Sequence, residues 1–241
     1  MRRIVPIALA LLIVALPRAA FAQSLNFDLG DGPSSTGRLI QLFLLFTVLS
    51  LAPSILVMVT CFTRIIVVLS FLRTALGTQQ TPPNQVLMSL ALFLTLFIMM
   101  PTLQESWDQG IQPYVAGQID EQQAFERSSA PVRVFMLKHV RDADLQLFAD
   151  AAKVDTGSTT EVPLRVLIPA FMISELRRSF EIGFLVFIPF LVIDMVVASV
   201  LMSMGMMMLP PVMIAMPFKI IFFVLVDGWF LIVGSLIQSF G

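Results

Sequence analysis

The feature that most constrains this chain is a set of long segments without any charged residue. Residues 39–63, 74–104, 195–218 and 228–241 contain no Asp, Glu, Lys or Arg. A helix needs about 20 apolar residues to cross a bilayer, and three of these segments exceed that length. Over the whole chain of 241 residues, 57% are hydrophobic and 13% charged, and the mean hydropathy is +0.90. The sequence predicts an all-α membrane protein built from long helical hairpins, with an amphipathic helical periplasmic segment.

The N-terminus has the pattern of a secretory signal peptide. Arg2 and Arg3 precede an apolar run over 4–16, and Ala20-Phe21-Ala22 supplies small residues at the two positions that signal peptidase requires. We expect residues 1–22 to be removed by cleavage after Ala22; the alternative is an uncleaved anchor helix. Residues 23–38 would then form a polar leader rich in Gly, Ser and Asp.

The segment 39–104 is predicted to hold the N-terminal hydrophobic helices. One helix is expected over 39–59 and a second over 86–100, ending at Pro101. Arg64 and Arg73 lie between them and are interpreted as part of a cytoplasmic loop, in agreement with the positive-inside rule. This orientation places the following segment in the periplasm.

The segment 105–182 is the part of the chain suited to water, because residues 102–182 hold 12 of the 16 acids and 8 of the 15 bases. One amphipathic helix is predicted from apolar residues spaced by three and four, namely Val132, Met136, Val140, Ala143, Leu147 and Ala151. A second is expected to begin near Pro169 and to carry Glu175, Arg177, Arg178 and Glu181 within helical reach of one another.

Residues 183–241 are predicted to form a C-terminal hydrophobic hairpin with a methionine-rich tip. The Pro210-Pro211 pair stops a helix, so the tip is expected near 210 and the second arm is expected to reach about Gln238. Asp194, Lys219 and Asp227 are the charges in this hairpin.

The two carboxylates of the hairpin are equally far from its predicted tip, and we expect Asp194 and Asp227 to face different neighbours or to share a proton. Lys219 is expected to pair across a subunit boundary. The alternative is that these residues lie in the interfacial zone or cap a broken helix.

Methionine is concentrated at the same tip, where 7 of the 15 methionines fall between 202 and 216. Met206, Met207 and Met208 directly precede Leu209-Pro210-Pro211, and Gly205 gives the backbone freedom beside them. Thioether side chains are flexible and polarizable, so a ring of them could close a pore against ions and still yield to a passing chain. The alternative is ordinary gap filling.

Catalytic motifs are not recognised in this sequence. His139, next to Lys138 in an amphipathic helix, is interpreted as a solvated residue. No phosphate-binding glycine loop, zinc-protease motif or nucleophile elbow occurs. The single cysteine, Cys61, excludes an intramolecular disulfide and is expected to pack as a small apolar residue. We therefore expect no enzyme activity, no cofactor, no metal site and no nucleic-acid partner.

Several motifs resemble the FliP family of flagellar type III export-gate subunits. They are TRIIVVLSFLRTALGTQQ at 63–80, PAFMISEL at 169–176, MGMMMLPP at 204–211, and PFKI at 217–220 continuing to DGW at 227–229. The resemblance implies a ring, expected to be pentameric, that assembles with FliQ and FliR. It also implies a place in the bacterial inner membrane within the flagellar basal body, with FlhA and FlhB nearby and membrane lipid around it.

The same resemblance implies that unfolded flagellar subunits pass through the ring, with energy supplied by a separate ATPase complex and the proton-motive force. It assigns the gate to Met206, Met207 and Met208. Glu175 would make an inter-subunit polar contact, the alternative being a helix cap or a local pair with Arg178. The resemblance also implies that the assembled hairpins are raised toward the periplasm and are not simple bilayer spans.

Three other functions are alternatives to the export gate. A small-solute transporter would need paired repeats and a polar site at the membrane midplane, and a membrane enzyme would need a convergent polar site; the sequence indicates neither. The homologous subunit of a virulence injectisome shares the core motifs, and the signal peptide and long soluble insertion favour the flagellar branch.

Overall fold

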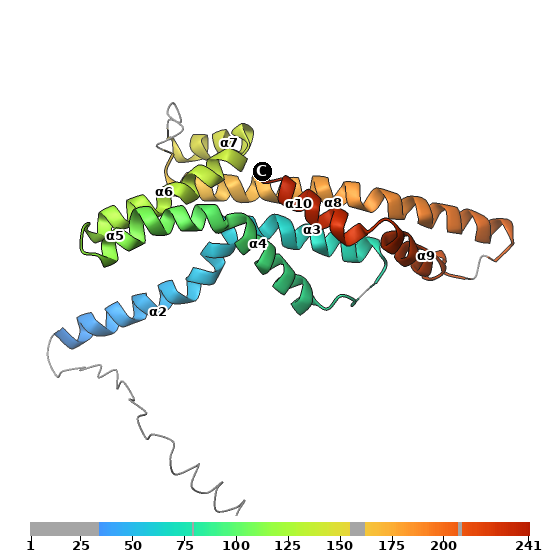
Figure 1. The fold of residues 1–241 in the computed structure, drawn as a ribbon, viewed down its shortest axis with the longest axis horizontal. Helices are drawn as coiled ribbons and strands as arrows, with labels where there is room; N and C mark the ends of the chain where they lie inside the picture. The colour runs from blue at the N-terminus through green and yellow to red at the C-terminus, as the bar shows by residue number, and fades with distance from the viewer. Residues whose placement is uncertain (1–33, 79, 155–161, 207–208) are drawn as a thin grey trace, which may run out of the picture. The chain divides into compact units, whose positions relative to one another are not determined.

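The computed structural model describes residues 34–78, 80–154, 162–206 and 209–241. The predicted signal peptide with its cleavage site at Ala22, most of the 23–38 leader, and Met207 and Met208 lie outside these residues. Helices and no strand occur in the described part (Figure 1), so the all-α prediction is confirmed there. The chain divides into two units, residues 1–50 and 51–241.

The described part of the first unit is the beginning of helix α2, Ser34–Val59. Its large apolar side chains, such as Phe43 and Leu49, are exposed. The hydroxyl groups of Thr47 and Ser50 donate to the carbonyls of Phe43 and Phe46, one turn earlier. A hydroxyl satisfied inside its own helix suits an apolar environment, where water is not available as a partner.

The second unit is organised around helix α3, Phe62–Ala75, which packs against helices α4, Asn84–Ser106, and α8, Leu164–Ser203. Ile65, Val68 and Leu69 of α3 are fully buried. Cys61, just before α3, is also fully buried in this core, as expected of a small apolar side chain. Helix α4 begins directly after Pro83, two residues before the predicted start at 86.

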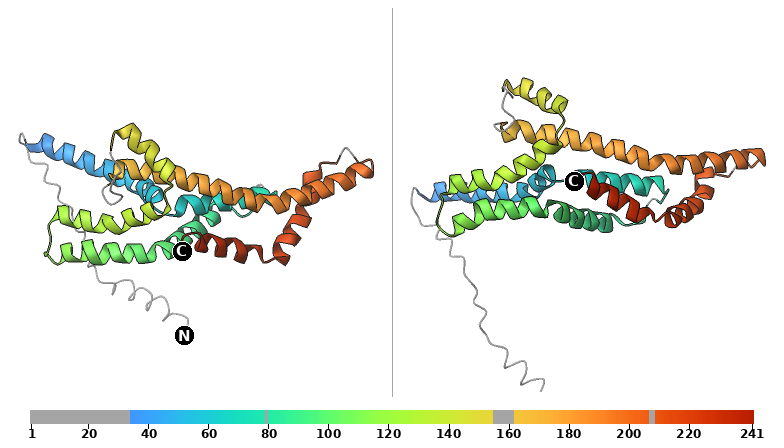
Figure 2. Two further views of the ribbon diagram at one scale, coloured as in Figure 1. Left: turned by 90° about the horizontal axis from the view of Figure 1, so that it is seen from above. Right: turned by 45° about the horizontal axis from the view of Figure 1, so that its top comes forward.

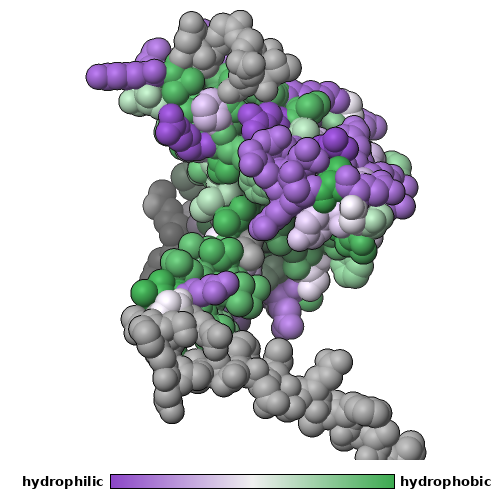
Figure 3. Space-filling model, turned by 90° about the vertical axis from the view of Figure 1, so that its left-hand side faces the viewer, coloured by the Kyte–Doolittle hydropathy of each residue, from purple (hydrophilic) through white to green (hydrophobic). Residues whose placement is uncertain are grey.

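Helix α4 is longer than predicted. Pro101 lies inside it, and the helix continues through a π-helical turn, Trp107–Ile111, into α5, Gln112–Val115. Gly110 in this turn packs so closely on α6, Glu121–His139, that a Cβ there would lie 2.6 Å from the backbone nitrogen of Ser128. Figure 3 views the molecule from the end where α5 and α6 meet, and hydrophilic side chains gather over that end.

The amphipathic helix predicted across 132–151 is two helices. Helix α6 ends at His139, Val140 is extended with ψ 143°, and α7 runs over Asp142–Ala152. This break shifts the helical phase, so Leu145 and Ala149 are buried in α7 while the predicted Leu147 is exposed. The Ser174 hydroxyl fixes the break from α8, because it accepts from the Arg141 N–H at 3.1 Å and donates to Asp144 at 2.7 Å.

Helix α8 is a single helix of 40 residues that begins after Pro163, not near Pro169, which lies inside it. The sequence boundary between the 105–182 and 183–241 segments therefore falls within one helix. Its first half packs on α6 and α7, and its second half packs on α9, Pro211–Leu225. One rigid element thus connects the polar and the apolar parts of this unit.

The C-terminal hairpin has its predicted tip, since α8 ends at Ser203 and α9 starts at Pro211. The second arm is not continuous: α9 and α10, Gly228–Gln238, meet at a bend of 64°. This bend returns the C-terminal end to the start of α3, as Figure 2 shows and as the hydrogen bond from Arg64 to the Ser239 carbonyl requires.

Within the described residues, two helical stretches are long and apolar enough to cross a membrane, Asn84–Val115 and Leu164–Ser203. Two further pairs qualify when each pair is taken as one broken span: 39–51 with 53–59, and α9 with α10. This is the composition of a membrane protein.

Candidate functional site

A buried ion pair between Arg64 and Glu175 joins α3 to α8. Arg64 Nε donates to Glu175 Oε2 at 2.8 Å, and Nη2 donates to Oε1, which makes the pair bidentate. The side chains are 4% and 0% exposed. Arg64 lies inside helix α3, so the loop predicted around it is wrong. Glu175 is fully buried and pairs with Arg64 of its own chain, not with Arg178.

The remaining donors of Arg64 hold the end of the chain. Nη1 donates to both the carbonyl and the hydroxyl of Ser239, each at 3.0 Å. The guanidinium carbon lies 3.7 Å from the ring centroid of Phe240, within cation–π distance. One buried cation therefore fastens α3, α8 and the residues after α10.

His139 packs against this cluster and is half-buried, so the prediction of a solvated residue is wrong. Its ring lies 4.6 Å from that of Phe135 and 5.2 Å from that of Phe240. Its Nδ1 lies 2.8 Å from the Phe135 carbonyl. Burial lowers the pKa of His139, because the charged imidazolium loses hydration there, and the side chain is neutral at pH 7.

A second ion pair lies in the C-terminal hairpin. Lys219 Nζ donates to Asp194 Oδ2 at 2.7 Å and to the Ala75 carbonyl at 3.1 Å. Lys219 is 3% exposed in its side chain, and the expected pairing across a subunit boundary is wrong. The pair connects α8 and α9 to the end of α3. Asp194 Oδ1 is buried without a hydrogen-bond partner among the described residues.

Asp227 lies at the break between α9 and α10, in surroundings that differ from those of the Lys219–Asp194 pair. It is exposed and has a left-handed backbone with φ 52°, which Asp tolerates better than most residues. It occupies the N-cap position of α10, but its side chain makes no capping hydrogen bond. The predicted level of Asp227 with Asp194 is wrong, because the helix of the first arm ends at Ser203 and not at the prolines. Asp194 lies 9 residues before that end, whereas Asp227 lies 16 residues and Lys219 only 8 residues beyond the start of α9, so Lys219 is the residue that meets Asp194.

The tip of the hairpin carries exposed methionines. Met202 and Met204 are 56% and 61% exposed, and Met206 is 37% exposed. Gly205 has φ 72°, a conformation that favours glycine, so the backbone turn there depends on this residue. Because Met207 and Met208 are outside the described residues, the gate assigned to the three methionines stays a prediction.

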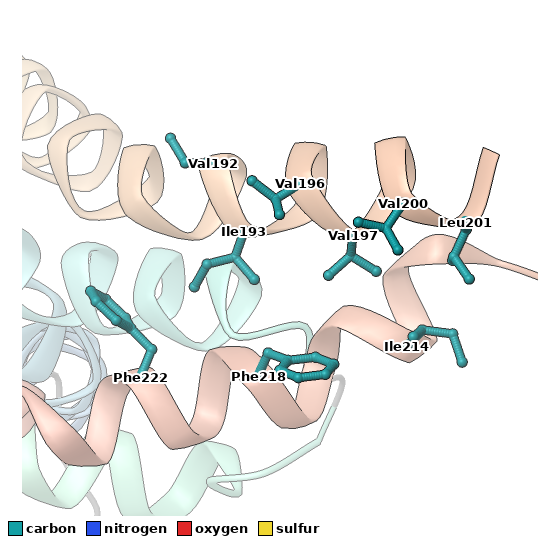
Figure 4. Close-up of a pocket in the computed structure, with 9 residues that line it drawn as sticks. All are labelled: Val192, Ile193, Val196, Val197, Val200, Leu201, Ile214, Phe218 and Phe222. Atoms are coloured by element: carbon teal, nitrogen blue, oxygen red, sulfur yellow. The ribbon is translucent and has the colours of Figure 1, made fainter. Parts of the chain in front are cut away.

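An apolar cavity of about 530 Å³ lies between α8 and α9 behind this tip. Figure 4 shows Val196, Val197 and Val200 of α8 facing Ile214 and Phe218 of α9 across it. The side chains that line it offer no group for catalysis.

Groups suited to reaction chemistry are scarce in the described part of the chain. No cluster of His, Cys, Asp or Glu there could hold a metal ion. Burial raises the pKa of the Cys61 thiol to about 11, so it is protonated and unreactive at neutral pH. The ionic groups described above hold helices together.

Arg64 and the Ser239-Phe240 turn are the contributors that sequence reasoning missed. The available signal was Arg64 itself, an isolated charge between two uncharged apolar segments. A charge buried in such surroundings needs an opposite charge, which Glu175 in α8 supplies.

Comparison with known proteins identifies the family. The family model described as "FliP family" matches residues 45–236. The flagellar biosynthetic protein FliP of Caulobacter vibrioides is 59% identical over 98% of this chain and 90% of its own length. That of Bacillus subtilis is 56% identical over 90% of this chain and 98% of its own length. The FliP protein of Agrobacterium fabrum is 51% identical over 95% of this chain and 96% of its own length. The chain belongs to the FliP family and is a component of the flagellar protein export apparatus.

Proposed function

We propose that this chain is the pore-forming subunit of the flagellar type III export gate and has no enzymatic activity of its own. Copies of the chain form a ring, expected to be pentameric, that assembles with FliQ and FliR beside FlhA and FlhB. The ring lies in the bacterial inner membrane, with a periplasmic portion, and passes unfolded flagellar subunits. Family membership supports this proposal, together with the features of the C-terminal hairpin described next.

The observation that carries the proposal is the uncovered apolar face of α8. Phe184, Leu185 and Met195 are 66%, 64% and 61% exposed, and Ile188 and Val192 continue the same face at helical spacing. The opposite face packs on α3 and α9 through Phe190 and Leu201. Helix α8 is apolar on all sides, but its own chain covers only one face. The exposed apolar face therefore needs lipid or further subunits to cover it.

The methionine-rich tip supports a pore in that assembly. A ring of identical hairpins would bring several copies of Met206 to Met208 to one level. Unbranched thioethers can fill a closed centre and repack around chains of different sequence. The exposure of Met202, Met204 and Met206 agrees with a tip that is left uncovered by its own chain.

The test replaces Met206, Met207 and Met208 together with Ala and measures flagellar subunit export and membrane ion leakage in cells. We expect leakage to rise while the ring still assembles, because three small side chains cannot close the centre. The control is Met58→Ala/Met88→Ala/Met100→Ala, which removes three exposed methionines elsewhere and should leave leakage unchanged. Unchanged export and ion tightness in the tip variant would show that these methionines only pack.

A further inference from the structure

A second cavity, of about 390 Å³, lies beside the Arg64–Glu175 pair and is polar. It is lined by Arg64, Lys138, His139, Arg141, Arg178 and Glu181. These residues come from α3, the end of α6, the α6–α7 connection and the middle of α8. The cavity therefore forms only when the elements of this unit have packed.

The charge around this cavity is positive. Arg64 is neutralised by Glu175, and Arg141 lies 3.7 Å from Asp144. Arg178 shares Glu181 with Arg177 on the exposed surface of α8. Lys138 is exposed and has no ion-pair partner among the described residues.

Around the cavity there are five cations, namely the four that line it and Arg177. In the part of the chain that the structure describes, only three acids, Glu175, Asp144 and Glu181, pair with these cations. His139 adds no charge at pH 7, because burial lowers its pKa. An anion that entered the cavity would meet a net positive field and N–H donors from several directions.

The position of the cavity along α8 indicates which anion. Arg177, Arg178 and Glu181 are the last charges before a segment from 182 to 203 whose only charge is Asp194. These 22 residues span about 33 Å as a helix, close to the thickness of a bilayer core of about 30 Å. In the membrane-inserted chain before the ring assembles, basic side chains at the end of such a segment lie where lipid headgroups lie.

The surface beside the cavity is suited to acyl chains. Phe180 and Phe184 of α8 are 58% and 66% exposed, and Leu185 follows them at 64%. A molecule with a phosphate group in the cavity and hydrocarbon along this face would satisfy both environments. A free phosphate ion would occupy the polar cavity but would leave the apolar face of α8 uncovered.

We propose that this cavity binds the phosphate of an anionic phospholipid. Lys138 and Arg178 supply the cationic donors at its mouth, and Arg141 supplies one from the α6–α7 connection. The bound lipid links the end of α6 to the middle of α8. The site is independent of the methionine gate.

The test uses the full chain purified from membranes and counts retained phospholipid by native mass spectrometry. The variant is Lys138→Gln/Arg178→Gln. The matched control, Arg127→Gln/Arg165→Gln, removes two exposed charges from the same two helices away from the cavity. We expect retention of anionic lipid to fall by about tenfold or more in the variant and to remain unchanged in the control, because each cation near an anionic headgroup contributes to binding.

A thermal-unfolding measurement separates the possible ligands. Reconstitution into vesicles containing phosphatidylglycerol should raise the unfolding temperature of the wild type above its value in phosphatidylcholine alone, and the variant should lose this difference. Equal protection by inorganic phosphate in phosphatidylcholine would overturn the lipid assignment. Unchanged lipid retention in the variant, with a change in ring size, would assign the cavity to a subunit contact and would also overturn it.

Discussion

At the scale of single residues, the Arg64–Glu175 pair is the most consequential feature of the core. Removing two charges from water has a large desolvation penalty, which the mutual attraction of the pair and the hydrogen bonds to Ser239 offset. Loss of one partner leaves the other charge buried without compensation. The pair therefore specifies how α3, α8 and the C-terminal turn meet.

We predict that Glu175→Ala destabilises the purified protein by about 3–5 kcal/mol, because Arg64 then remains as an unpaired buried cation. Arg64→Ala should have a similar effect. The double variant should lose less unfolding free energy than the two single variants lose together, since neither charge is then left buried without its partner. Unfolding in detergent, followed by circular dichroism, measures all three.

The control for this prediction is Arg177→Ala, which removes a cation from an exposed pair with Glu181. Exposed pairs contribute little, so its unfolding curve should match that of the wild type. If Glu175→Ala behaved like Arg177→Ala, the buried pair would have no role in holding α3 to α8.

At the scale of elements, the contact between α3 and α8 depends on a close approach at Gly183. A Cβ at this position would lie 2.5 Å from Phe71 Cδ2 and 2.7 Å from Cγ. Phe71 cannot move away freely, because its ring packs edge-on against Phe180 with centroids 5.1 Å apart. Glycine inside a helix is normally unfavourable, and here it permits the two helices to touch.

We predict that Gly183→Ala destabilises the protein by about 1–3 kcal/mol, because the overpacking exceeds the gain in helix propensity. The matched change is Gly234→Ala in α10, where a Cβ would meet nothing within 4 Å. That change should stabilise by about 0.5–1 kcal/mol. Thermal unfolding of the two variants should thus shift in opposite directions, and a shift in the same direction would contradict the close-contact argument.

At the scale of the whole molecule, unfolding stability and assembly depend on different surfaces. The ion pairs and the Gly183 contact lie within the chain, whereas the exposed apolar face of α8 has no cover from it. The environment of that face must come from lipid or from neighbouring subunits. A charge placed there should affect membrane insertion and assembly more than internal packing.

We predict that Met195→Asp abolishes ring formation and export, because an acid in an apolar membrane environment is unfavourable by about 2.5–3.5 kcal/mol. Met195 is 61% exposed and lies on the uncovered face of α8, so the change leaves the internal core intact. Met195→Leu should assemble normally. Light scattering of the purified complex and a motility assay measure the two effects.

A second control introduces the same acid elsewhere. Gln146→Asp lies on the exposed side of α7, in the polar part of the chain, and should leave ring size and motility unchanged. Normal assembly of Met195→Asp would show that this face of α8 meets water in the complex.

Local sequence patterns determined the fold class and the position of the hairpin tip. An uncharged segment of this length satisfies all its backbone hydrogen bonds internally when it is a helix, and this holds whatever the tertiary packing. The Pro210-Pro211 pair marked a helix boundary that the structure reproduces, because proline acts on the backbone next to it. The family motifs extended the same local information to function.

The tertiary structure decided where helices continue or break and which charges meet. Pro101 and Pro169 stop no helix, because the packing of the long helices around them outweighs one lost hydrogen bond. The break at Val140 is held by Ser174, 34 residues away, and so had no local signal. Arg64 and Glu175 are 111 residues apart in the chain. Spacing along a sequence identifies partners within one helix, whereas partners from different helices are fixed only when the whole core has packed.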